Sequence, residues 1–386
     1  MNKKKLAHSG IQSSITSVLA ALLCILIGLV VGFIVLLVIN PGHAWGDGLV
    51  RILKGGFYDA PYGVGKTLAN AAPLIMTGLS VGFAFKTGLF NIGAAGQYTL
   101  GAYGALYCAI MLKLPWFVCL LVATLFGGIW GAIPGFFKAY LNINEVITAI
   151  MFNWIGLYLV NELIYQNGTG PMYDVRNTRT FNLRKNPDYA QSIIPDFGLN
   201  KMFQTNSTTI AIFLAVVVAI VIWVILDKTT FGYELKAVGL NKNAAKYAGI
   251  NEKKNIVLSM AIAGALAGFG AGLYYLSSVS EWNPLNSTSL PAIGFNGIPV
   301  ALLASSNPIG TIFSALFISH ISVGGSFLST KYYPTEISDL ISGIIIYLCA
   351  FSMLFRGKIH ALLFKNADKT NVNAEPASAN AKKEGK

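Results

Sequence analysis

DKTTFGYELKAVGLNKNAAKYAGINEKK, residues 227–254, forms a polar island between two long apolar runs. Six lysines accompany only three carboxylates in it, which predicts a cytoplasmic location by the positive-inside rule. Asn241 is expected to cap a short helix over residues 242–248, and Gly249 to end that helix in the left-handed conformation. Because so short a helix is marginal alone in water, we expect the membrane bundle or a cytosolic protein to pack on it. The alternative is an ordinary solvated loop.

The composition of the chain is that of a membrane protein. Of its 386 residues, 54% are hydrophobic and 11% are charged, and soluble domains carry roughly twice that charged fraction. The net charge is +12, but the basic residues cluster in Lys3–Lys5, in the island and in Arg356–Lys386. Separate clusters of this kind orient a protein in the membrane and favour anionic lipid, and they do not indicate nucleic-acid binding.

The spacing of apolar runs predicts about ten membrane spans, several of them short or interrupted. They fall near residues 17–39, 66–85, 90–112, 115–137, 145–165, 207–226, 255–278, 290–304, 308–325 and 337–355. The sequence therefore predicts an all-α, polytopic transmembrane helical bundle with both termini in the cytoplasm. Residues 1–16 would be a cytoplasmic N-terminus, 17–355 the transmembrane domain, and 356–386 a disordered basic tail. Prolines interrupt the pair 290–304 and 308–325, for which a re-entrant hairpin is the alternative.

The longest segment between spans, residues 166–206, is expected on the outer side of the membrane. A loop of this length is usually functional or disordered. Two interpretations stay open for it: a docking surface for an extracytoplasmic partner, or a partly ordered cap.

Small residues recur at four-residue spacing within the predicted spans. They are Gly78 and Gly82, then Gly127, Gly131 and Gly135, then Gly264, Gly268 and Gly272. In lipid, such faces allow close approach of helices, so they indicate packing and not chemistry.

Motifs for catalysis and nucleotide binding are missing from the sequence. The run GVGKT at residues 63–67 lacks the glycine that a phosphate-binding loop requires five positions before Gly65, where this chain has Ala60. The four histidines are too scattered for a metal or catalytic cluster, and His320 is expected to be a packing residue. We expect the cysteines to be reduced packing residues as well: Cys24, Cys108, Cys119 and Cys349. We therefore expect neither a metal site nor a cofactor on this chain, and no enzymatic reaction.

Polar side chains at membrane depth are the more informative candidates, because an unpaired amide in hydrocarbon is costly. Four neutral amides could line a pathway for a neutral, hydrogen-bonding solute: Asn91, Gln97, Asn153 and Asn296. Each of them could equally make a helix-to-helix hydrogen bond. Glu145 follows Asn144 at the start of a span, where a carboxylate interacts favourably with the helix dipole, and we expect that role instead of a substrate contact.

Five runs of the sequence resemble the permease subunits of ABC importers. They are GLFNIGAAGQYTLGAYGA (88–105), NEVITAIMFNWI (144–155), LKAVGLNKNAAKYAGI (235–250), AIAGALAGFGAG (261–272) and GFNGIPVALLASSNPIG (294–310). The branch that they resemble serves ribose and other simple sugars, nucleosides and branched-chain amino acids, and the nucleoside-type permeases are the most similar. The chain departs from that family where Ala95 replaces a frequent Glu and Asn296 a frequent Asp, so substrate contacts are not transferred at these positions.

The resemblance implies a machine of several chains in the bacterial plasma membrane. A second permease, identical or a paralogue, would share the pathway, and two cytosolic ATPases would bind ATP and each hold one coupling helix. A solute-binding lipoprotein or periplasmic protein would deliver the solute at the outer face. On this chain we assign the ATPase coupling to small residues that allow close docking and to residues that set the helix ends: Gly239, Asn241, Ala244, Ala245 and Gly249.

Three alternatives to a nucleoside importer remain. The same machine could carry ribose or another simple sugar. An ATP-independent secondary carrier or channel would need ionisable coupling residues at mid-membrane, in which this chain is poor. An intramembrane enzyme would need a catalytic constellation that the sequence lacks.

Overall fold

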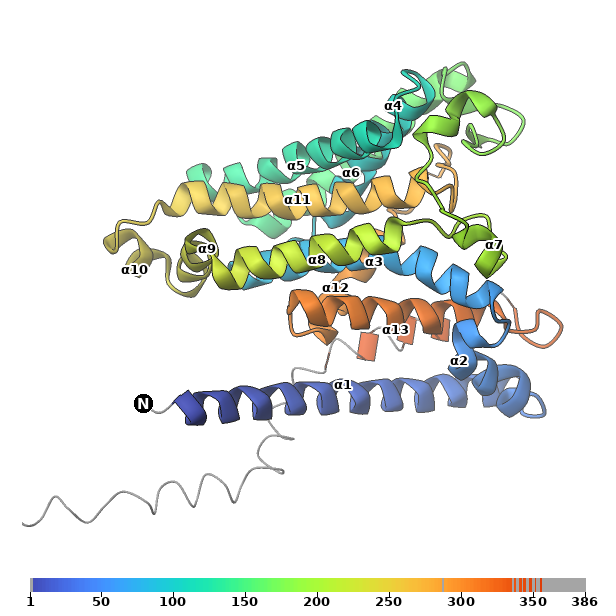
Figure 1. The fold of residues 1–386 in the computed structure, drawn as a ribbon, viewed down its shortest axis with the longest axis horizontal. Coiled ribbons are helices and arrows are strands. Elements are labelled where there is room, and N and C mark those ends of the chain that lie inside the picture. The colour runs from blue at the N-terminus through green and yellow to red at the C-terminus, as the bar shows by residue number, and fades with distance from the viewer. Residues whose placement is uncertain are drawn as a thin grey trace, which may run out of the picture.

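The apolar runs fold into a bundle of long helices (Figure 1). The computed structural model describes residues 3–286, 288–334, 337, 340–341, 343–344, 347–348, 351 and 355. Its long helices are α1 (Lys3–Ile39), α3 (Tyr62–Lys86), α4 (Ala94–Ile110), α5 (Trp116–Leu141), α6 (Glu145–Tyr165), α8 (Ala211–Lys228), α11 (Glu252–Leu276) and α13 (Pro308–Ser326). Shorter helices are α2 (Val50–Lys54), α7 (Leu199–Phe203), α9 (Thr230–Leu240), α10 (Lys242–Tyr247) and α12 (Ala292–Leu303).

Seven helices of the described part of the chain are long and apolar enough to cross a membrane, so this is a multi-pass membrane protein. They are α1, α3, α5, α6, α8, α11 and α13. Two further helices, α4 with 17 residues and α12 with 12, account for two more of the predicted spans. The tenth predicted span, 337–355, lies largely outside the described residues, and the predicted basic tail, 356–386, lies wholly outside them.

Two helices differ in length from the predicted spans. α1 begins at Lys3, so most of the predicted N-terminal segment 1–16 continues the helix that contains the first span. α12 has 12 residues and covers only about 18 Å, which is less than the roughly 30 Å of a bilayer core. The proline-rich pair at residues 290–325 is therefore a half-length helix followed by the full-length α13.

The turns that carry Lys86 and Lys138 lie beside the island at one end of the bundle. A methyl group on Gly88, just after Lys86, would lie 2.5 Å from Cα of Gly239 at the end of α9. The ammonium group of Lys253 lies 5.1 Å from the ring centre of Tyr140 in the last turn of α5. Both contacts place these turns beside the island, as the positive-inside rule predicts. We call this end, which carries α9 and α10 in Figure 1, the inner end, and the opposite one the outer end.

α11 packs on α5 through the two predicted glycine faces. A methyl group on Gly127 would lie 2.4 Å from the carbonyl oxygen of Gly264 and 2.7 Å from Cα of Gly268. Gly268 also meets α4, since a methyl group on Gly101 would lie 2.4 Å from its Cα. The backbones of α4, α5 and α11 therefore touch without side chains between them, as small-residue packing in lipid allows.

The outer segment 166–206 is folded and closes the outer end of the bundle. It contains the helical turns η3 (Gln166–Gly168) and η4 (Pro187–Ser192), the strands β1 (Tyr173–Asp174) and β2 (Arg179–Thr180), and α7. Its amide groups at Ile194 and Thr180 donate to the carbonyl oxygens of Leu276 (3.0 Å) and Trp282 (2.9 Å). The cap interpretation of this segment is thus the one that the structure supports, and docking on its surface stays a prediction.

Substitutions at adjacent glycines test the α5–α11 contact. Gly127→Ala places a methyl group against the α11 backbone, so we expect it to lower the free energy of unfolding by about 1–3 kcal/mol. Gly128→Ala is the matched control, because its methyl group would find its nearest neighbours at 3.4 Å, an ordinary contact distance. Thermal denaturation of the detergent-solubilised protein measures both. Equal midpoints for the two variants would contradict the close packing.

Candidate functional site

The polar island folds into two short helices with a polar cap at each start. Thr229 caps α9, and Asn241 caps α10 by accepting a hydrogen bond from the backbone amide of Ala244 (3.0 Å). Asn251 caps α11 in the same way, at 3.0 Å from the amide of Lys254. Gly249 has φ +82°, and its amide donates to the carbonyl oxygen of Lys246 (3.0 Å). The short helix, its Asn241 cap and its left-handed glycine are therefore confirmed as local structure.

The five residues assigned to ATPase coupling do not all face the same way. Gly239 packs on the backbone of Thr87 and Gly88, at the turn between α3 and α4. Ala245 is buried against an apolar cluster of the bundle, whereas Ala244 is exposed. The island thus packs on the bundle through Gly239 and Ala245, whereas Ala244 is exposed to solvent.

Two large apolar side chains at the inner end were missed by the sequence reasoning. Leu240 is 89% exposed and Tyr247 is 92% exposed. The sequence carried a signal for them, because a leucine and a tyrosine stand next to the caps of an otherwise polar island. Together with the exposed Ala244 they make up a candidate docking surface, called below the inner docking surface: Leu240, Ala244 and Tyr247.

Two of the four membrane-depth amides, Asn91 and Gln97, form one buried network. Asn91 donates from Nδ2 to Oε1 of Gln97 (2.7 Å), and Gln97 donates from Nε2 back to Oδ1 of Asn91 (2.9 Å). Asn91 also donates to Oγ of Ser80 on α3 (2.9 Å). Each amide side chain is at most 1% exposed. Asn91 and Gln97 are therefore hydrogen-bonded to each other in this conformation.

Asn153 of α6 holds the start of α4. Its Oδ1 accepts a hydrogen bond from the amide of Gly96 (2.8 Å), and its Nδ2 donates to the carbonyl oxygen of Ile92 (3.0 Å). The residue at the N-cap position of α4, Gly93, has no side chain to satisfy the free amides of the first turn. Asn153 thus caps α4 from a neighbouring helix.

Asn296 stands apart from this network in its bonding. It is half-buried on α12, and its side chain makes no hydrogen bond with the described residues. The segment that carries it nevertheless packs on the start of α4, because a methyl group on Gly294 would lie 2.4 Å from Cα of Ala95. Among the four predicted pathway amides, Asn296 is therefore the one whose side chain has hydrogen-bonding groups free of the described residues.

Other side chains singled out in the sequence have structural partners. Glu145 lies in the first turn of α6 and pairs with Lys138 at 2.9 Å, next to the Asn144 cap. His320 accepts from the amide of Gly56 through Nδ1 (3.2 Å) and lies 3.2 Å from the carbonyl oxygen of Leu53 through Nε2. It therefore joins α13 to the segment around α2 as a packing residue.

The remaining candidates of the sequence are also placed. The GVGKT run forms the first turns of α3 and is not a loop. Cys24, Cys108 and Cys119 are buried and form no disulfide, whereas Cys349 lies outside the described residues.

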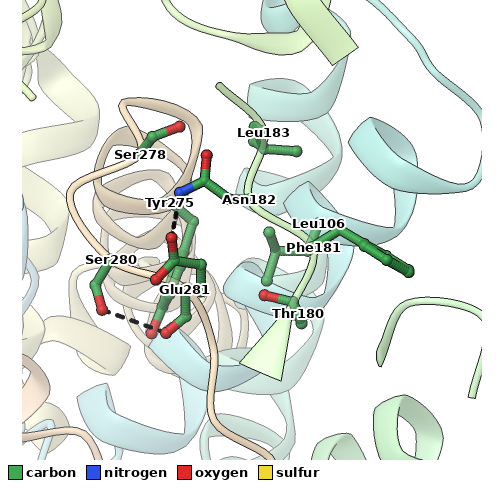
Figure 2. Close-up of a pocket in the computed structure, with 9 residues that line it drawn as sticks. All are labelled: Leu106, Thr180, Phe181, Asn182, Leu183, Tyr275, Ser278, Ser280 and Glu281. Carbon is green, nitrogen blue, oxygen red and sulfur yellow. Dashed lines mark hydrogen bonds between the residues drawn. The ribbon is translucent and has the colours of Figure 1, made fainter. Parts of the chain in front are cut away.

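A small pocket lies at the outer end, between the β2 segment and the end of α11 (Figure 2). Its volume is about 10 Å³, room for about one water molecule and far below the roughly 300 Å³ at which small-molecule sites begin. Figure 2 shows the Glu281 carboxylate accepting a hydrogen bond from Asn182, and Arg179 lies 3.6 Å from the same carboxylate. These groups pair with each other across the contact between the cap and the bundle. The pocket is therefore part of that contact, which we call the outer seam.

An ion pair on the surface also links the cap to the helices. Lys113, in the turn between α4 and α5, lies 2.6 Å from the Asp188 carboxylate of η4, and this hydrogen bond raises the pKa of Lys113. Arg184 is half-buried in the cap, and burial lowers the pKa of its guanidinium group. An exposed ion pair thus joins the cap to this turn, in addition to the backbone hydrogen bonds.

Comparison with known proteins identifies a family and several similar proteins. Residues 63–350 match the family described as branched-chain amino acid transport system / permease component. The chain is 32% identical over 344 residues to the guanosine ABC transporter permease protein NupP of Bacillus subtilis, covering 86% of this chain and 93% of the relative. It is 32% identical over 323 residues to the nucleoside ABC transporter permease protein NupB of Lactococcus lactis, covering 81% and 86%.

A third relative carries a sugar in its name. The chain is 29% identical over 330 residues to a glucose ABC transporter permease protein of Haloferax volcanii, covering 83% of each. No solved structure matches this chain.

Removal of the Asn153 amide tests the cap on α4. Asn153→Ala leaves the amide of Gly96 and the carbonyl of Ile92 without their partner, and an orphaned buried group costs about 1–3 kcal/mol. We expect a clear fall in the thermal midpoint of the solubilised protein. Asn296→Ala is the control, because that side chain gives up no hydrogen bond to the described residues, and its midpoint should stay near that of the intact protein. An Asn153 variant as stable as the control would overturn the capping role.

Proposed function

Because this chain belongs to the family of branched-chain amino acid transport system permease components, we propose that it forms part of the pathway of an ABC importer for nucleosides. The chain is a transport subunit and not an enzyme. The observation that carries the choice of solute is the extent of the similarity to the guanosine and nucleoside permeases, which covers more than four fifths of this chain. Neutral polar groups in the bundle suit such a solute, since a nucleoside offers hydrogen-bonding groups without a net charge.

A sugar such as ribose is the second candidate solute. It is supported by the similarity to the glucose permease, which extends over 83% of this chain at slightly lower identity. Both solutes carry several hydroxyl groups, so the distinction lies in whether the base is required.

At the inner end, the partner in this proposal is a cytosolic ATPase that binds the inner docking surface. The support is the exposure of Leu240 and Tyr247 on a segment whose ends are fixed by caps, because apolar side chains clustered on a basic cytoplasmic surface are typical of a protein interface. ATP would be bound by that partner, and this chain would need no cofactor of its own. Gly239, Asn241, Ala245 and Gly249 would position the surface, and Ala244 would contact the ATPase.

At the outer end, the proposed partner is a solute-binding lipoprotein or periplasmic protein that docks on the cap. Phe197 and Met202 support this, because they are large apolar side chains exposed at and beside α7. The proposed setting is the bacterial plasma membrane, with a second permease chain, either a copy or a paralogue, completing the pathway.

The solute is tested by uptake into cells that lack this chain and are complemented with it. We expect the intact chain to restore uptake of labelled adenosine, guanosine, cytidine or uridine, and an excess of unlabelled ribose to leave that uptake unchanged. Restoration of ribose uptake without nucleoside uptake would favour the second candidate. Uptake that continues after cellular ATP is depleted would contradict an ATP-driven importer.

Adjacent alanines separate coupling from folding at the inner end. Ala244→Arg puts a bulky charge on the inner docking surface without disturbing the bundle, so uptake should fall at least about tenfold at unchanged protein level, an interface cost of roughly 1.4 kcal/mol or more. Ala245→Arg buries an unpaired charge in the bundle, so the amount of protein in the membrane should fall instead. Full uptake by Ala244→Arg would show that α10 was assigned the wrong role.

A further inference from the structure

A polar cleft opens at the outer end, between the start of α3 and the end of α13. Residues of α3, of α13, of the segment before α8 and of the segment after α11 line it: Lys66, Ala69, Asn70, Ser207, Val279, Ser322, Val323 and Ser326. Its volume is about 220 Å³. This is below the roughly 300–1,000 Å³ of sites that hold a whole small molecule, so the cleft has room for part of a solute. This cleft is separate from the outer seam and from the amide network.

The walls of the cleft are two helical faces with matching polar pairs. Lys66 and Asn70 are four residues apart on α3, and Ser322 and Ser326 are four residues apart on α13, so each pair lies on one helix face. The two helices are joined at this level, because Oγ of Ser319 donates to the carbonyl oxygen of Thr67 (2.8 Å). The spacing of the polar groups across the cleft is therefore set by the bundle.

The polar side chains of the cleft have hydrogen-bonding capacity to spare. Within the described part of the chain, Asn70, Ser207 and Ser322 form no side-chain hydrogen bond. Lys66 forms no ion pair there either, and its ammonium group lies 4.7 Å from the ring centre of Tyr62. Only Ser326 is satisfied, by the carbonyl oxygen of Val323 (2.7 Å).

These unbonded side chains differ from Asn91 and Gln97 of the amide network, which are buried and hydrogen-bonded to each other. Open polar groups in the outer part of membrane-spanning helices cannot face hydrocarbon at low cost, so the cleft must face water or a polar ligand. Among the described residues that line it, none is acidic. The cleft therefore offers N–H and O–H donors without a carboxylate that would neutralise the lysine.

We propose that this cleft is the outer binding subsite of the pathway and that it holds the ribose of a nucleoside, with Lys66 and Asn70 as the residues that recognise its hydroxyl groups. The inference rests on the proposed function and adds the site and the part of the solute that is recognised. Lys66 donates to hydroxyl oxygens, and Asn70, Ser207 and Ser322 can donate and accept. Ala69, Val279 and Val323 supply the apolar contact that a sugar ring also needs.

The test combines variants of the protein with variants of the solute. Cells that lack this chain are complemented with the intact chain, Lys66→Met, Asn70→Leu, Lys66→Arg or Lys54→Met. Initial rates of uptake are measured for the nucleoside that the intact chain carries best and for the dideoxynucleoside that lacks both secondary hydroxyls of the ribose. Lys54 is the matched control, because it is an exposed lysine at the outer end that does not line the cleft. Protein in the membrane is quantified for each variant.

The same solute-binding protein serves every variant, so each variant is compared with the intact chain for each solute. Lys66→Met and Asn70→Leu should raise the KM for the nucleoside about tenfold, the factor of one strong hydrogen bond, with the maximal rate and the KM for the analogue unchanged. Lys66→Arg and Lys54→Met should behave as the intact chain does.

Three results would overturn the proposal. An unchanged KM in Lys66→Met and Asn70→Leu would exclude contact between the cleft and the solute. Equal loss for both solutes would show that the variants act on the fold and not on the hydroxyl groups. Failure of the intact chain itself to carry any nucleoside would refute the proposed function, and the subsite with it. The first two results would leave the proposed function standing.

Discussion

The contact between the backbones of α4, α5 and α11 is the constraint on which the rest of the bundle depends. In lipid the hydrophobic effect does not drive helices together, so their association relies on close van der Waals packing. Gly268 meets Gly127 on one side and Gly101 on the other, and no side chain separates the three helices there. With α4 held in this way, its first turn reaches Asn153 of α6, and the turn before it reaches Ser80 of α3. The packing of small residues thus sets the geometry of the polar network.

The polar groups of the protein divide into two populations. Asn91, Gln97 and Asn153 are buried and bonded to one another or to backbone, so they stabilise the fold. Lys66 and Asn70, in contrast, are half-buried and have bonding capacity left over. Because a buried polar group is expensive without partners, the populations are expected to differ in role. Residue type alone does not distinguish them, since an asparagine occurs in both.

Sequence reasoning predicted the features that depend on local chemistry. The Asn241 cap, the short helix and the left-handed Gly249 follow from the preferences of those residues, and the glycine faces follow from their spacing. It could not tell which way a side chain points, so Ala244 and Ala245 were treated alike although one is exposed and the other buried. It also selected Asn91 and Gln97 as pathway candidates without seeing that they lie within 2.7 Å of each other. Lys66 entered only as part of a rejected motif, because the second wall of its cleft comes from α13, more than 250 residues further along the chain.

The placement of Gly239 has a mechanical consequence. α9 and α10 are separated by one residue, Asn241, whose side chain already caps the second helix. Gly239 in turn touches the backbone at Thr87 and Gly88, three residues before Asn91. This contact joins main chain to main chain, without a side chain that could change rotamer. Under the proposed coupling, a movement of α10 toward the bundle would therefore be transmitted to the segment that ends at the start of α4.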